Sequence, residues 1–350
     1  MPQPVNAVLL AAGQGKRMHS DLPKVLHPLA GLPMIEHCLR AIAGVADSTP
    51  VVVIGHGADQ VRRAIGEKAR FVVQNEQSGT AHALQMAEPE LADRPGLVLV
   101  SAGDMPLLTA RTFSRMIEAQ RSNRGPLTML SVILPDAHGF GRVVRAEDGS
   151  VRAIVEEAQA TPEELAIHEL NAGVYCFDNT WLWGALRRIK ISPKGEYYLT
   201  DIVGLAVEDG LQVQVLSVED AQEALGINTR QHLAEAAAVL RSRINQRWLL
   251  AGVSMVDPTA TYIDMDVTIG RDTELWPGTH LQGNTVIGAS CQIGPDVQII
   301  DSQIGKNCRV SYSVVEDRIL PDGTVLGPFA HRRSGQDIRP PGEEERGKQV

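Results

Sequence analysis

The stretch LAAGQGKRM, residues 10–18, decides how the N-terminal part of the chain is interpreted. It continues directly from the apolar run at residues 7–10, which has the composition of a buried strand. Gly13 and Gly15 let the backbone approach a ligand closely, and the free N–H groups of such a turn attract anions. The spacing fits neither the dinucleotide fingerprint nor the Walker phosphate loop. The sequence therefore predicts a strand that ends in an anion-binding glycine turn of another kind.

Three cations lie close to this turn. Lys16 and Arg17 follow Gly15 directly, and Lys24 stands eleven residues after Gly13. Several positive charges are what the developing charge on a triphosphate requires. A tight turn followed by solvated basic residues would give the same local pattern, so this stretch alone leaves both interpretations open.

Short apolar runs alternate with longer helix-like segments from Asn6 to about Arg230. This alternation is typical of a mostly parallel sheet covered by helices, so we predict a doubly wound α/β domain over residues 1–230. The expected strands are residues 7–10, 51–54, 71–73 and 97–100, and the expected helices between them include residues 34–42 and 81–87.

An aliphatic residue recurs every six positions after about Ala251, at Ile263, Ile269, Leu275, Leu281, Ile287, Ile293 and Ile299. The period then slips by one residue and continues at Ile304 and Val310. A β-sandwich would instead show period-2 alternation over strands of varied length. We therefore predict a short left-handed hexapeptide-repeat β-helix over residues 251–333. Residues 231–250 are expected to form a connecting helix, and residues 334–350 a disordered tail.

Composition excludes several classes of protein. The chain has 350 residues, and its 33 Lys and Arg against 42 Asp and Glu give a formal net charge of −9, which disfavours nucleic-acid binding. The four cysteines form no CxxC pair, so neither a disulfide framework nor a zinc ribbon is indicated. No apolar run approaches the roughly 20 residues of a membrane span, and no signal peptide is recognisable. We expect no membrane insertion and a cytoplasmic protein.

The stretch LLAAGQGKRMHSDLPKVLHPLAG, residues 9–31, resembles the signature of the sugar-nucleotidyltransferases. More closely, the chain resembles the N-acetylglucosamine-1-phosphate uridylyltransferases that carry a C-terminal acetyltransferase β-helix. The likeness runs from Val5 to about Gly335 through QNEQSGTAHAL, AGDMPLL, GFGRVVR, VEEAQAT, ELNAGVYCF, GEYYLTDIV and GINTR. It implies a Mg²⁺-dependent transfer of uridylyl from UTP to N-acetylglucosamine 1-phosphate, with release of pyrophosphate. The alternatives are a glucose-1-phosphate uridylyltransferase or thymidylyltransferase, and a non-catalytic sugar-nucleotide-binding scaffold.

The resemblance also implies roles for individual residues. Arg17 and Lys24 would be catalytic, and Asp104 and Asn228 would hold the metal, because Mg²⁺ accepts one or two protein oxygens and completes its shell with water and phosphate. The nucleotide would be bound by Leu10, Ala11, Ala12, Gly13, Gln74, Gly79 and Thr80. The sugar would be bound by Gly141, Glu156, Asn171, Thr200 and Asn228. Ala102 stands where some family members have an aromatic residue beside the sugar.

In the resembled family the β-helix forms a homotrimer and builds a second site for acetyl transfer. Here residues 327–335, GPFAHRRSG, resemble the family's GPFARLRPG, but the further coils that carry its catalytic histidine and its coenzyme A contacts do not follow. We therefore expect a homotrimer without acetyltransferase activity.

Overall fold

The structure is a computed structural model that describes residues 3–135, 139–334 and 336–338. The expected tail at residues 334–350 lies largely outside these described residues. The chain divides into two compact units, of which the first comprises residues 1–27 and 33–233 and the second residues 28–32 and 234–350. Among the described residues, no helix is both long and apolar enough to cross a membrane.

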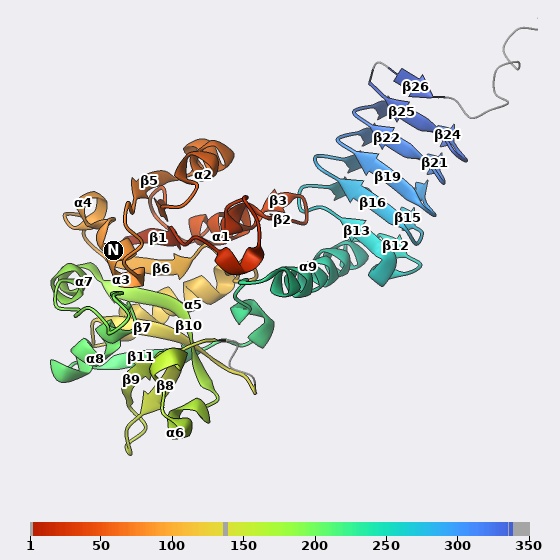
Figure 1. Cartoon of the computed structure of the whole chain (residues 1–350). Coiled ribbons are helices and arrows are strands. Elements are labelled where there is room, and N and C mark those ends of the chain that lie inside the picture. Colours follow the sequence, from red (N-terminus) through yellow and green to blue (C-terminus); the bar gives the residue numbers. More distant parts are fainter. Residues whose placement is uncertain (1–2, 136–138, 335, 339–350) are drawn as a thin grey trace, which may run out of the picture. The chain divides into compact units, whose positions relative to one another are not determined.

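The first unit contains a mixed sheet in the order β11-β7-β10-β6-β1-β4-β5, with β8 and β9 attached beside β10 (Figure 1). Its strands are β1 (Val5–Ala11), β4 (Val51–Ile54), β5 (Arg70–Val73), β6 (Leu97–Ala102), β7 (Leu127–Ile133), β8 (Arg142–Arg145), β9 (Val151–Val155), β10 (Glu169–Asp178) and β11 (Val213–Ser217). Its helices are α1 (Met34–Ala43), α2 (Ala58–Ile65), α3 (Thr80–Gln85), α4 (Glu88–Leu91), α5 (Ala110–Ser122), α6 (Pro162–Leu165), α7 (Asn179–Leu186) and α8 (Asp201–Glu208).

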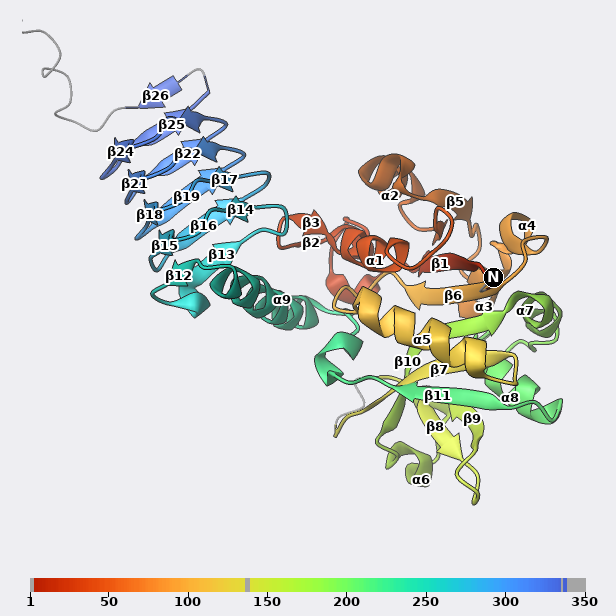
Figure 2. The same cartoon turned by 180° about the vertical axis from the view of Figure 1, so that it is seen from behind.

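Helices cover both faces of this sheet, because its central strands are apolar on both sides. On one face, Leu9 and Leu99 pack in a buried cluster that includes side chains from α1, α2 and α5. On the other face, Val8 and Val98 pack in a second cluster with side chains from α3, α7 and α8. Figure 2 shows α5 lying across β7 and β10. The predicted doubly wound α/β class is confirmed.

The sheet is less parallel than the sequence predicted. β1, β4, β5 and β6 pair in parallel, but β10 runs antiparallel to both β6 and β7. The register of β10 shifts between Asn171 and Tyr175, and Gly173 lies between them with a φ of 70°. This bulge changes the direction of the strand where it passes the cavity described below.

The second unit also contains most of the long helix α9 (Arg230–Leu250), the short strand β2 (Pro28–Leu29) and the first residue of its partner β3 (Leu32–Pro33). Asn245 on α9 is buried and donates hydrogen bonds to the carbonyl oxygens of Pro258 and Thr261. The amide of Met265 donates to the carbonyl oxygen of Ala30 at 3.0 Å. These bonds attach the helix and the loop between β2 and β3 to the first coil of the β-helix.

The second unit is a left-handed parallel β-helix, as predicted, with three sheets of short strands stacked coil on coil (Figures 1 and 2). The first sheet is β12 (Ser254–Met255), β15 (Glu274–Leu275), β18 (Gln292–Ile293), β21 (Arg309–Val310) and β24 (Val325–Leu326). The second is β13 (Thr261–Ile263), β16 (Thr279–Gln282), β19 (Val297–Ile300), β22 (Val314–Glu316), β25 (His331–Arg333) and β26 (Gln336–Ile338), and the third is β14 (Thr268–Ile269), β17 (Val286–Ile287), β20 (Gln303–Ile304) and β23 (Ile319–Leu320).

The repeating aliphatic residues point inward, as the six-residue period predicted. Ile263 pairs with Leu281, which pairs with Ile299, and all three side chains are buried. Ile299 then pairs with Val315, sixteen residues later, whereas the first two steps are each eighteen residues. The sequence indicated that the period slips by one residue, whereas this third step is two residues shorter than the first two.

Candidate active site

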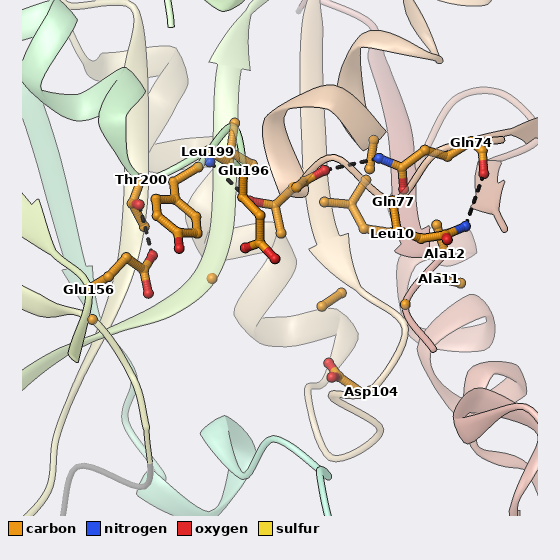
Figure 3. A pocket seen from close by; sticks show the side chains of 18 of the residues that line it. Leu10, Ala11, Ala12, Gln74, Gln77, Asp104, Glu156, Glu196, Leu199 and Thr200 are labelled. Atoms are coloured by element: carbon orange, nitrogen blue, oxygen red, sulfur yellow. Dashed lines mark hydrogen bonds between the residues drawn. The ribbon is translucent and has the colours of Figure 1, made fainter. Parts of the chain in front are cut away.

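A cavity of about 670 Å³ opens in the first unit, at the carboxyl ends of β1, β5 and β6. This is the edge where open α/β sheets bind their ligands. Most of the residues singled out from the sequence come together around it, namely Leu10, Ala11, Ala12, Gly13, Lys24, Gln74, Gly79, Thr80, Asp104, Gly141, Glu156, Asn171 and Thr200. In Figure 3, Gln74 and Gln77 lie toward one side of this cavity, Glu156 and Thr200 toward the other, and Asp104 between them.

The nucleotide end is built around the buried side chain of Gln74, which follows β5. Its Nε2 donates to the carbonyl oxygen of Gly79 at 3.0 Å and lies 3.1 Å from Nδ1 of His82. The Nε2 of Gln77 donates to the carbonyl oxygen of Gln74 at 3.4 Å. An amide fixed in this way presents both donor and acceptor groups, which suits recognition of a flat heterocycle with an imide edge.

The turn at Gly79 is packed tightly against the segment that leads to the other end of the cavity. Gly79 has a φ of 107°, and a Cβ at this position would lie 2.4 Å from the carbonyl oxygen of Tyr197. The amide of Ala81 donates to that same carbonyl oxygen at 3.0 Å. Because both the φ and the close approach exclude a side chain, only glycine fits here without strain.

The opposite end carries the hydrogen bond between Thr200 and Glu156, in which the hydroxyl donates to Oε1 at 2.8 Å. Burial raises the pKa of the Glu156 carboxyl, an effect that the Thr200 hydroxyl opposes. Glu156 follows β9, and Thr200 precedes α8. A carboxylate held in this way accepts hydrogen bonds, and hydroxyl groups of a sugar donate them.

Asn171 is positioned by the bulge in β10. Its side-chain Nδ2 donates to the hydroxyl of Tyr175 at 2.8 Å, and its Oδ1 accepts a hydrogen bond from the backbone amide of Gly173. The backbone amide of Asn171 donates to the carbonyl oxygen of Gly141. A Cβ at Gly141 would lie 2.8 Å from Cγ2 of Ile154, so the close packing of β8 against β9 depends on the glycine.

Between the two ends, Lys24 connects the residues that were expected to hold a metal. Its Nζ lies 2.5 Å from Oδ2 of Asp104 and 3.2 Å from Oδ1 of Asn228. The amide of Ile227 donates to the carbonyl oxygen of Asp104 at 2.9 Å, which fixes the segment that carries Asn228 beside the segment that carries Asp104. Three distant parts of the sequence thus meet at one ammonium group.

Two of the predicted residues do not line the cavity. Asn228 accepts a hydrogen bond from Lys24, which does line the cavity, and Arg17 is exposed on the short 3-10 helix Lys16–Met18. Lys16 lines the cavity instead. The sequence indicated several cations near Gly13, but the direction of each depends on the tight turn at Gly15, whose φ is 62°.

Sequence reasoning missed three polar residues at the cavity, Gln77, Tyr175 and Glu196. Gln77 and Tyr175 lie within the motifs QNEQSGTAHAL and ELNAGVYCF, so their positions carried a usable signal. Glu196 is exposed in the loop before Tyr198, and its place in GEYYLTDIV gave the only indication.

The geometry is compatible with a divalent cation at Asp104 and Asn228. One carboxylate oxygen and one amide oxygen already bind a cation there, the ammonium of Lys24. Such oxygens are the ligands of Mg²⁺ in sites that are completed by water and phosphate. No cluster of three or more His, Cys, Asp or Glu suited to a metal occurs in the part of the chain that the structure describes. A metal bound here would therefore depend on its substrate for further ligands.

Comparisons with known proteins agree with this geometry. The family described as MobA-like NTP transferase domain matches residues 7–169. A bifunctional protein GlmU of Shouchella clausii is 42% identical over 333 residues, which cover 95% of this chain and 73% of the relative. The chain belongs to the GlmU family. Bifunctional GlmU proteins of Brevibacillus brevis and Exiguobacterium sibiricum are each 44% identical, over 95% and 93% of this chain and 73% of each relative.

Membership in the GlmU family indicates that this chain is a nucleotidyltransferase, and it makes the cavity the candidate active site. The matched range 7–169 contains the glycine turn, Gln74, Asp104 and Glu156. The identity to GlmU proteins extends over both the α/β unit and the β-helix, because the aligned length of 333 residues exceeds either unit. The chain is thus a GlmU-type nucleotidyltransferase with a hexapeptide-repeat β-helix.

Proposed function

We propose that this chain transfers a uridylyl group from UTP to N-acetylglucosamine 1-phosphate and releases pyrophosphate. The observation that carries the proposal is the order of groups along one cavity. The fixed amide of Gln74 lies toward one side, the bonded pair of Glu156 and Thr200 toward the other, and Asp104 between them (Figure 3). Lys24, which also lines the cavity, is bonded to Asp104. A base, a phosphate chain and a sugar follow the same order in a sugar nucleotide.

The chemistry needs little from the protein beyond alignment. The phosphate of the sugar is already an oxyanion, so no general base is needed for its in-line attack on the α-phosphorus. The protein must hold two anions that repel each other, and the backbone turn at Gly13 with Lys16 and Lys24 supplies positive potential there. Gln74 and Thr80 fix the nucleotide at one side, while Asn171 and Glu156 fix the sugar.

Mg²⁺ would be held by Asp104 and Asn228 and would screen the charge that builds up on the leaving pyrophosphate. The ammonium of Lys24 between the two oxygen atoms supports this assignment, since it is a cation bound by the same donors. Arg17 would act on the phosphates after its side chain turns toward the bound nucleotide.

The most informative test is a substrate panel followed by pyrophosphate release. UTP with N-acetylglucosamine 1-phosphate is expected to react fastest, ahead of UTP or dTTP with glucose 1-phosphate. A faster reaction with glucose 1-phosphate would replace the proposed sugar with the alternative. Calorimetric binding of a UDP-sugar with no turnover of any pair would favour the non-catalytic scaffold.

For the β-helix we propose assembly into a homotrimer in the cytoplasm. Large apolar side chains are exposed on its later coils, with Ile319, Val325 and Phe329 each more than 70% exposed. Such surface favours association with a further chain. Sedimentation measures the assembly directly, and a monomer at micromolar concentration would contradict it. That this chain has no acetyltransferase activity remains a prediction, to be tested by assaying it for acetyl-CoA consumption with glucosamine 1-phosphate.

A further inference from the structure

The ammonium of Lys24 occupies the position between the two oxygen donors of the expected metal site. Nζ lies 2.5 Å from Oδ2 of Asp104 and 3.2 Å from Oδ1 of Asn228. The side chains of Lys24 and Asp104 are 13% and 21% exposed, so this pair is only partly screened by water. A partly buried carboxylate without a cation would be unfavourable, and Lys24 supplies that cation.

A divalent ion and the ammonium cannot occupy this position together. A Mg²⁺ ion binds its oxygen ligands at about 2.0–2.1 Å and requires near-octahedral geometry. The ammonium of Lys24 already contacts Oδ2 of Asp104 and Oδ1 of Asn228, the two oxygen atoms that the metal would need, and its charge would repel an ion that approached them. The ammonium and the metal therefore compete for these two oxygen atoms.

The surroundings of Lys24 show where its side chain can go. Lys24 lines the cavity together with Gly13, Gln14 and Lys16, the residues of the glycine turn. A Cβ at Gly15 would lie 2.6 Å from Cβ of Lys24, so the absence of a side chain at Gly15 makes room for the lysine stem. The side chain of Lys24 therefore lies within the cavity and next to the anion-binding turn.

From these contacts we propose that Lys24 is an exchangeable counter-ion, which blocks the divalent-cation site of the free enzyme and leaves it when a triphosphate binds. The proposal rests on the proposed function for its ligand, a nucleoside triphosphate. The phosphates draw the ammonium toward the glycine turn, and the two oxygen donors then become free for the metal. Metal and nucleotide thereby stabilise the same arrangement of Lys24, so each increases the affinity of the other.

The test measures the affinity of the free protein for Mn²⁺, from the electron paramagnetic resonance signal of the unbound ion. Wild type is expected to bind Mn²⁺ weakly without nucleotide and more tightly with a non-hydrolysable UTP analogue. Lys24→Met removes the ammonium and keeps an unbranched stem. It is expected to bind Mn²⁺ roughly 10-fold or more tightly than wild type without nucleotide, because the competing charge-assisted hydrogen bond is lost. The analogue should then increase the affinity of this variant for Mn²⁺ less than it does in wild type.

Lys16→Met is the matched control, because Lys16 lines the same cavity and its loss changes the net charge by the same amount. It is expected to change the Mn²⁺ affinity of the free protein by no more than about 2-fold, a general charge effect in high dielectric. Circular dichroism verifies that both variants are folded, and if Lys24→Met is not, Lys24→Gln takes its place. An unchanged affinity in the Lys24 variant, or an equal increase in the Lys16 control, would overturn the proposal.

These outcomes are distinct from failure of the proposed function. If no substrate pair releases pyrophosphate but Lys24→Met still increases Mn²⁺ affinity, the proposed reaction fails and the exchange at the cation site stands. If the reaction occurs but the Mn²⁺ affinity is the same in wild type and variant, only the exchange fails.

Discussion

The hydroxyl oxygen of Thr80 accepts a hydrogen bond from the backbone amide of Leu199 at 2.9 Å. Thr80 begins α3 beside the buried Gln74, whereas Leu199 immediately precedes Thr200, the partner of Glu156. This bond therefore joins the segment expected to bind the nucleotide to the segment expected to bind the sugar. The two ends of the cavity depend on each other for their position.

Replacing Thr80 with Val tests this dependence. Valine keeps the shape but leaves the amide of Leu199 without its acceptor, at a cost of about 1–3 kcal/mol. We expect KM to rise roughly 5-fold or more for both substrates, because both segments shift. Steady-state kinetics with each substrate varied in turn measures this. Thr80→Ser keeps the hydroxyl and should behave like wild type, and a rise confined to the nucleotide KM would contradict the coupling.

Asp104→Ala should abolish metal-dependent turnover while the fold is retained, because the carboxylate is the charged member of the proposed pair of metal ligands. Pyrophosphate release at several Mg²⁺ concentrations measures the loss, and circular dichroism measures the fold. Asp104→Asn, which keeps the size of the side chain, is expected to be nearly as inactive. A wild-type rate in the Ala variant would refute the metal assignment.

Arg17→Ala should lower kcat more than it raises KM, because the guanidinium is expected to act on charge that develops in the transition state. Its side chain is exposed in the described structure, whereas Lys16 lines the cavity. Lys16→Ala is therefore the comparison, and we expect its effect to fall mainly on the nucleotide KM. An effect of Arg17→Ala on KM alone would show that the arginine only binds substrate.

Glu156→Gln should stabilise the protein near neutral pH while it lowers activity. Burial raises the pKa of Glu156 above its usual value of 4.5, so the folded state takes up the proton more readily than the unfolded state does. The contribution of Glu156 to the stability of wild type is therefore fully present below pH 4.5 and is lost as the pH rises through its pKa in the folded protein. Glutamine carries no such charge.

The measurement for Glu156→Gln is the melting temperature of both proteins across the acid and neutral range. The variant is expected to melt above wild type at neutral pH, and the difference should vanish below pH 4.5. A difference that does not change with pH would show that burial of the charge is not its cause.

Ile293→Ala should destabilise the β-helix by roughly 2–5 kcal/mol, because Ile293 is fully buried between Leu275 and Val310 of the neighbouring coils. Gln292→Ala changes the adjacent, partly exposed residue and should cost about 0.5 kcal/mol or less. Denaturation by urea, followed by circular dichroism, compares the two variants. Equal losses would contradict the inward direction of the aliphatic column.

The features that the sequence predicted well are those set by local patterns. The glycine turn after β1 and the aliphatic column from Ile263 to Val310 could be predicted because a strand alternates its side chains and each coil repeats the same positions. The motif around Gln74 likewise predicted a residue of the cavity. The antiparallel direction of β10 was missed, because strand direction leaves no mark on the periodicity of a strand buried on both faces.

Sequence alone thus indicated which kinds of element this protein contains and most of the residues that line its cavity, since hydrophobic period, glycine and charge act over a few neighbouring positions. Tertiary structure decided how those residues meet. Lys24, Asp104 and Asn228 come from three separate segments, and tertiary contacts such as the pairing of β1 with β6 and the bond from Ile227 to Asp104 bring their side chains together. Electrostatic attraction at 2.5 Å depends on distance in space, which spacing along the chain does not specify.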